Sequence, residues 1–84
     1  MNKYFIEVFS DKLGYTLSLL EVRADNFAFS EYGTLEFLIG GKEIAFFHAN
    51  GMYNRSELFS GFILKCNGVE ILKYYKSIDK WLGL

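Results

Sequence analysis

The stretch LEFLIGGKEIAFFHANG, residues 35–51, decides the fold of this chain. Two apolar segments flank Gly40 and Gly41, and adjacent glycines suit the two-residue turn of a β-hairpin, which requires positive φ angles. A phosphate-binding loop would need more backbone amides at the start of a helix, and that pattern is absent from the sequence. We therefore expect a strand over residues 35–39 to pair with a strand over residues 42–48.

The pairing expected for this hairpin gathers large apolar side chains on one face. Phe37 would face Ile44, and Leu35 would face Phe46, since opposite residues of an antiparallel pair share a face of the sheet. The single histidine, His48, has the same parity as Ile44 and Phe46. We therefore expect His48 to point toward the apolar face near the end of its strand.

Alternating patterns elsewhere predict further strands. Residues 3–10 alternate with a period of two, and a short strand within residues 24–30 would place Phe27 and Phe29 on one face. Residues 15–23 also alternate, but their phase slips at Leu19–Leu20, which indicates a β-bulge. Residues 58–66 form another apolar run. We expect a mainly β protein of the α+β class, built on a small curved antiparallel sheet or half-barrel with a short C-terminal helical segment.

The C-terminal segment, residues 67–82, supports two interpretations. Asn67-Gly68 is a strong hairpin signal and would place Lys65 opposite Glu70. The same Asn67 stands three residues before Glu70, as in a helix capping box. Apolar residues then follow at helical spacing: Ile71, Tyr75, Ile78 and Leu82. We expect a helix here, and the alternative is a hairpin that ends in a helical turn at residues 77–83.

The expected core collects the apolar residues on the inward-facing positions of these elements. Its members are Ile6, Val8, Leu17, Phe27, Phe29, Leu35, Phe37, Ile44, Phe46, Leu64, Ile71, Ile78 and Leu82.

Composition limits the class of protein. The 84 residues predict a single domain, residues 1–84, and 51% are apolar and 19% aromatic, which is enough to form a core. One cysteine, Cys66, cannot form an internal disulfide. No stretch has the length of a transmembrane helix, and the first residues lack a secretion-signal pattern. We expect a cytoplasmic protein that does not associate with membranes.

The residue inventory argues against most site chemistries. One cysteine and one histidine cannot supply a zinc set, and neither a calcium-binding loop nor a nucleophile elbow occurs in the sequence. We expect no metal, no cofactor and no catalytic set. The alternative is a small metal-independent nucleic-acid-processing enzyme centred on His48, with Tyr53, Arg55 and Glu57 as the nearby groups.

Two groups of residues are candidates for binding a protein partner. One is a loop that offers residue types enriched at interface centres, and the other is a lysine stripe on the expected helix, suited to an acidic partner. The residues are Met52, Tyr53 and Arg55 in the loop, and Lys73, Lys76 and Lys80 in the stripe. The net charge of −1 argues against nucleic acid as the sole partner, and a homodimer is an open alternative.

The segment VRADNFAFSEYGTLEFLIGGKEIAFF, residues 22–47, resembles a pattern in small β-rich proteins of phages and bacteria. In that pattern a short ADxFxF strand precedes GxLxF and GKEIAxF. Many such proteins are uncharacterised, and some small phage proteins of this size inhibit host defence, including anti-CRISPR proteins. The resemblance implies a small β-rich fold. It also implies, as an expectation, a non-enzymatic protein-binding module that inhibits a host defence complex.

Overall fold

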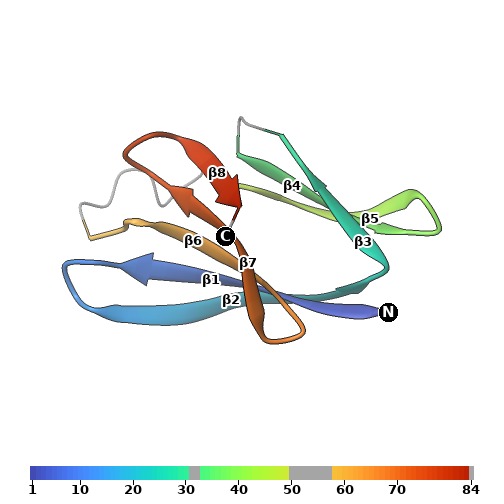
Figure 1. The fold of residues 1–84 in the computed structure, drawn as a ribbon, viewed down its shortest axis with the longest axis horizontal. Helices are drawn as coiled ribbons and strands as arrows, with labels where there is room; N and C mark the ends of the chain where they lie inside the picture. The colour runs from blue at the N-terminus through green and yellow to red at the C-terminus, as the bar shows by residue number, and fades with distance from the viewer. Residues whose placement is uncertain (31–32, 50–57, 84) are drawn as a thin grey trace.

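The computed structural model describes residues 1–30, 33–49 and 58–83, and its regular elements are all β-strands (Figure 1). The strands are Asn2–Ser10 (β1), Tyr15–Ala24 (β2), Asn26–Phe29 (β3), Thr34–Ile39 (β4), Lys42–His48 (β5), Gly61–Cys66 (β6), Val69–Tyr75 (β7) and Lys80–Gly83 (β8). In the described part of the chain no helix has the length and apolarity needed to cross a lipid bilayer.

The strands form two antiparallel sheets rather than the one curved sheet expected. One sheet has five strands in the order β2-β1-β6-β7-β8, and the other has three in the order β3-β4-β5. The chain passes between them at Asp25, whose backbone N–H donates to the carbonyl oxygen of Leu38 at 2.9 Å. The Asp25 carboxylate also accepts a hydrogen bond from the N–H of Gly40 at 3.2 Å. The residue at which the chain changes sheet is thus tied to the tip of the β4–β5 hairpin.

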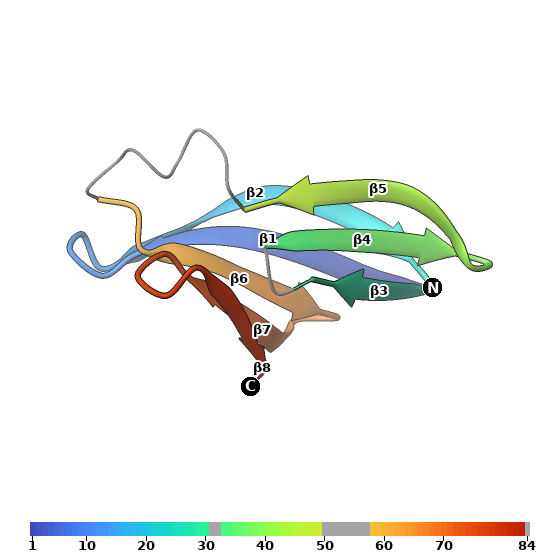
Figure 2. The ribbon, with the colours of Figure 1, turned by 90° about the horizontal axis from the view of Figure 1, so that it is seen from above.

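The core lies between the two sheets, which pack face to face (Figures 1 and 2). Aromatic contacts join them: the rings of Tyr4 and Phe37 lie 5.4 Å apart, and those of Phe47 and Phe62 lie 4.7 Å apart. The buried members of this cluster are Tyr4, Ile6, Val22, Ala24, Leu35, Phe37, Ala49, Phe59, Phe62, Leu64, Leu72, Tyr74 and Trp81.

The predicted core is right in part. The buried members among the predicted residues are Ile6, Leu35, Phe37 and Leu64, and those half-buried against the cluster are Val8, Phe27 and Ile71. The prediction is wrong for the residues that are exposed, which are Leu17, Phe29, Ile44, Phe46, Ile78 and Leu82. Leu17 pairs with Val8 near the turn of the β1–β2 hairpin, and the turn end of this hairpin extends beyond the smaller sheet (Figures 1 and 2).

The β4–β5 hairpin is confirmed, with Gly40 and Gly41 at φ angles of 56° and 78°. Next to the turn the register is that of a two-residue loop, with Ile39 opposite Lys42 and Leu38 opposite Glu43, but Phe37 then pairs with Ala45 and not with Ile44 as predicted. Between the pairs Leu38–Glu43 and Phe37–Ala45, β4 advances by one residue and β5 by two, so residue 44 is the extra residue of a β-bulge. The bulge reverses the faces of the rest of β5, so that residues 45 and 47 face the core and residues 44, 46 and 48 face solvent.

The bulge predicted in β2 is confirmed. Ile6 pairs with Leu20 while the next residue, Glu7, pairs with Ser18, which leaves Leu19 as the extra residue. The phase slip in the sequence therefore marked a real irregularity of the strand.

The predicted C-terminal helix is wrong. Asn67 and Gly68 have φ angles of 50° and 87° and form the turn of a β6–β7 hairpin, and β8 then pairs with β7. Lys65 faces Glu70, as the hairpin alternative required. The next pair is Leu64 with Leu72, so residue 71 is bulged. Because of this bulge, the adjacent residues Ile71 and Leu72 both pack against the core, and this break in the period of two resembles helical spacing.

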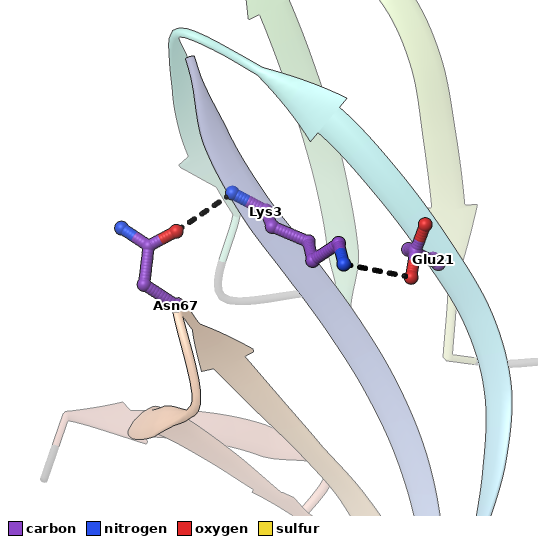
Figure 3. A network of polar contacts seen from close by, with 3 residues as sticks. All are labelled: Lys3, Glu21 and Asn67. Atoms are coloured by element: carbon purple, nitrogen blue, oxygen red, sulfur yellow. Dashed lines mark hydrogen bonds and ion pairs between the residues drawn. The ribbon is translucent and has the colours of Figure 1, made fainter.

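The turn residue Asn67 also fixes the N-terminal end of β1. Its side-chain oxygen accepts a hydrogen bond from the Lys3 N–H at 2.9 Å, and its own N–H donates to the Lys3 carbonyl oxygen at 2.8 Å. Its amide group donates to the side chain of Asn2 at 3.1 Å. The Lys3 ammonium points the other way, toward Glu21 of β2 at 3.7 Å (Figure 3). These contacts join the turn to β1 and, through Lys3, to β2.

Candidate protein-binding surface

The β7–β8 hairpin presents a row of side chains on the outer face of the larger sheet. Tyr74 points into the core, so the strand alternation directs its neighbours Lys73 and Tyr75 outward. In β8, Lys80 pairs with Tyr75, and Leu82 pairs with Lys73. Leu82 is 44% exposed. Two cationic, one aromatic and one aliphatic side chain therefore share this face.

The first strand of the sheet adds an aromatic ring to this row. The Nζ atom of Lys73 lies 4.4 Å from the ring centroid of Phe9 and 5.3 Å from that of Tyr75. The two rings meet edge to face at 6.1 Å. Because aromatic ring faces attract cations, the Lys73 ammonium is held over this pair. Gly61 of β6 pairs with Phe9 on one side and with Tyr75 on the other, and because it has no side chain the two rings can meet.

Lys76 follows β7 directly and borders the same face. Its Nζ atom lies 5.9 Å from the ring of Phe59, and its backbone N–H donates to the carbonyl oxygen of Ser60 at 3.0 Å. Shallow hollows border Lys76 and Lys73, and Asp11 is the acidic residue that lines both. We use the name lysine–aromatic surface for the set Phe9, Lys73, Tyr75, Lys76, Lys80 and Leu82.

The charges of Lys73 and Lys80 are not neutralised in the way that those of Lys3 and Lys65 are. Among the described residues, Lys3 and Lys65 form ion pairs with Glu21 and Glu7, at 3.7 and 3.1 Å. Neither Lys73 nor Lys80 makes such a pair within the described part of the chain.

The acidic residue next to Lys80 in the chain, Asp79, is engaged elsewhere. Its carboxylate accepts a hydrogen bond from the buried hydroxyl of Tyr74. Burial raises the pKa of Tyr74, and the hydrogen bond and charge of Asp79 raise it further. The surface therefore keeps two ammonium groups without a carboxylate partner among the described residues.

The sequence predicted the lysines of this surface but not how they come together. Lys73, Lys76 and Lys80 were expected on one side of a helix, whereas strand pairing gathers them around Tyr75. Phe9 was not predicted as a site residue. Its signal was the second apolar face of residues 3–10, and on that face its ring is buried, 6% exposed, in contact with Lys73 and Tyr75.

The other predicted partner-binding residues, Met52, Tyr53 and Arg55, lie outside the described residues, as does Glu57.

His48 does not point toward the core as expected. It ends β5 opposite Thr34 and is exposed, because the bulge at residue 44 reverses the outward positions of the strand. Cys66 is half-buried at the end of β6. The described residues contain no group of three or more His, Cys, Asp or Glu side chains that could hold a metal ion.

A second exposed patch lies on the outer face of the smaller sheet. Ile44 and Phe46 of β5 are 49% and 64% exposed. These side chains are apolar, and the sheet they belong to is not the one that carries the lysine–aromatic surface. The two patches are therefore alternative candidates for a docking surface.

No protein-family model matches the chain, and neither a curated protein nor a solved structure matches it. Function is therefore inferred from the residues of these surfaces and their geometry.

Proposed function

We propose that this protein is a small non-enzymatic protein-binding module that docks through the lysine–aromatic surface. The observation that carries the proposal is the pair Lys73 and Lys80, which flank the ring of Tyr75 without a carboxylate partner among the described residues. Aromatic side chains are enriched at interface centres, and desolvated charges there require an opposite charge from the partner. An acidic partner fits this surface.

The proposal extends to the kind of activity that such docking serves. A module that covers a functional surface of another protein inhibits it without any catalytic residue. This agrees with the resemblance of residues 22–47 to small phage and bacterial proteins, some of which inhibit host defence. We propose a host defence complex as the class of target.

The first test is a charge reversal with a matched control. The double variant Lys73→Glu and Lys80→Glu should lose partner capture, by roughly 2 kcal/mol or about 30-fold in affinity, because truncated or reversed charges in an interface typically cost this much. The control reverses Lys12 and Lys42, which are exposed lysines outside the lysine–aromatic surface, and changes net charge equally. It should bind as the unmodified protein does.

Quantitative pull-down from host cells and thermal unfolding of each variant supply the readouts. Full capture by the Lys73 and Lys80 variant, with the fold intact, would contradict the proposal. So would the absence of any captured protein together with nucleic-acid cleavage that depends on His48, which is the outcome expected of the enzyme alternative.

A further inference from the structure

We propose that the partner contributes an extended acidic segment, which binds by adding a strand to the edge of β8 that is unpaired among the described residues. This inference rests on the proposed function and specifies its partner. The lysines of the surface recognise the charge of the segment, and the backbone of β8 recognises its extended conformation.

The first step is the edge itself. β8, Lys80–Gly83, is the last strand of the five-stranded sheet, and in the described residues it pairs only with β7. Alternate N–H and C=O groups of such a strand point away from the sheet and are free to pair with another chain. Peptide recognition by strand addition uses this kind of edge.

The second step is charge. Opposite residues of paired strands share one face, so the outward side chains of an added strand would lie beside Lys80 and Leu82. Lys73 stands on the same face, one strand further in, opposite Leu82. A carboxylate beside Lys80 and an apolar side chain two residues away beside Leu82 would complement this edge. The segment is thus expected to combine acidic and apolar residues on one face.

The same charges disfavour other occupants. A second copy of this chain paired edge to edge at β8 would bring the Lys73 and Lys80 of both copies to one face, and like charges at an edge oppose such pairing. A nucleic acid has no peptide backbone to pair with the strand, and the net charge of −1 and the nearby Asp11 oppose phosphates. An acidic peptide satisfies both the charge and the backbone.

The experiment uses the full chain and a fluorescent peptide of about eight residues that repeats Glu-Thr-Val-Thr, so that glutamate and valine alternate along one face of the extended peptide. Fluorescence anisotropy should report binding that weakens as salt increases. The variants Lys80→Glu and Lys73→Glu should each weaken it about tenfold or more, whereas Lys42→Glu, in the other sheet, should not. The peptide with every backbone nitrogen methylated keeps its charge but cannot pair as a strand, so it should not bind.

Hydrogen exchange supplies an independent readout, since the amides of β8 should exchange more slowly when the unmethylated peptide is bound. Equal binding of the methylated peptide, equal binding to the Lys80→Glu variant, or tighter Lys80-dependent binding of an oligothymidylate would each overturn the inference. If the peptide does not bind but the Lys73 and Lys80 double variant still loses partner capture, strand addition is wrong and the proposed function stands.

Discussion

At the scale of single residues, Gly61 makes the contact between Phe9 and Tyr75 sterically feasible. It pairs with both residues across neighbouring strands. A Cβ atom at this position would overlap the carbonyl oxygen of Tyr74 and would come within 2.7 Å of the Phe9 ring. The absence of a side chain therefore has a packing reason and not a conformational one.

Replacing Gly61 with alanine should lower the free energy of unfolding by about 3 kcal/mol, because the backbone of β7 or the ring of Phe9 must move. Gly83 in β8 is the matched control, since among the described residues no atom other than those of Gly83 and its chain neighbours lies within 4 Å of the position of its Cβ. Gly83→Ala should leave stability nearly unchanged. Urea unfolding measures both variants, and an equal, small effect of the two substitutions would contradict the close packing around Gly61.

Tyr74 provides a test by pH. Its hydroxyl is buried and donates to Asp79, and burial and this hydrogen bond raise its pKa in the folded state. A tyrosine in the unfolded chain loses its proton near pH 10, so above about that pH the unfolded state binds fewer protons than the folded state. The contribution of the Tyr74 hydroxyl to the free energy of unfolding is therefore complete below about pH 10 and decreases as the pH rises above it.

We therefore expect the free energy of unfolding to fall as pH rises above about 10, and Tyr74→Phe to flatten this decline. A residual slope belongs to Tyr4, whose pKa is also raised by burial. Denaturant titrations at a series of alkaline pH values measure the slope. An identical slope in the Tyr74→Phe variant would contradict the assignment.

At the scale of elements, the predictions succeeded where local chemistry is decisive. Gly40 and Gly41 determine their turn because only glycine adopts two consecutive positive φ angles without steric cost. The bulge at Leu19 was visible because two adjacent leucines, Leu19 and Leu20, shift the phase of the apolar alternation. By contrast, residues 44–47 are apolar on both faces, so the sequence contained no sign of the bulge there.

Substitutions of Asn67 test how strongly the β6–β7 turn is joined to β1. Asn67→Gly keeps the positive φ but removes the side-chain bonds to Lys3 and Asn2, and should cost about 1 kcal/mol of stability. Asn67→Ala loses the same bonds and adds the strain of a left-handed alanine, at a further cost of about 1 kcal/mol. Thermal unfolding ranks the variants. A glycine variant as stable as the parent protein would mean that the contacts with β1 contribute nothing.

At the scale of the whole molecule, the feature that could not be predicted from the sequence is which distant strands pair with each other. The pairing of β1 with β6 joins residues more than fifty positions apart, and it is this pairing that places Phe9 near Lys73. No local pattern encodes such a neighbour. The lysines could be identified from the sequence, whereas Phe9 and the edge position of β8 follow only from the order of strands.

The two exposed patches make the central claim directly testable. Leu82 lies on the lysine–aromatic surface and Ile44 on the smaller sheet, with similar exposures of 44% and 49%. A photo-crosslinking phenylalanine derivative at either position reports contact with a partner without changing the charge of the protein. Thermal unfolding establishes that both labelled proteins are folded.

Irradiation in host cells should give a covalent adduct with a single protein from position 82 and none from position 44, if the partner docks on the β7–β8 hairpin. An adduct from position 44 and none from position 82 would contradict the account and assign the interface to the smaller sheet.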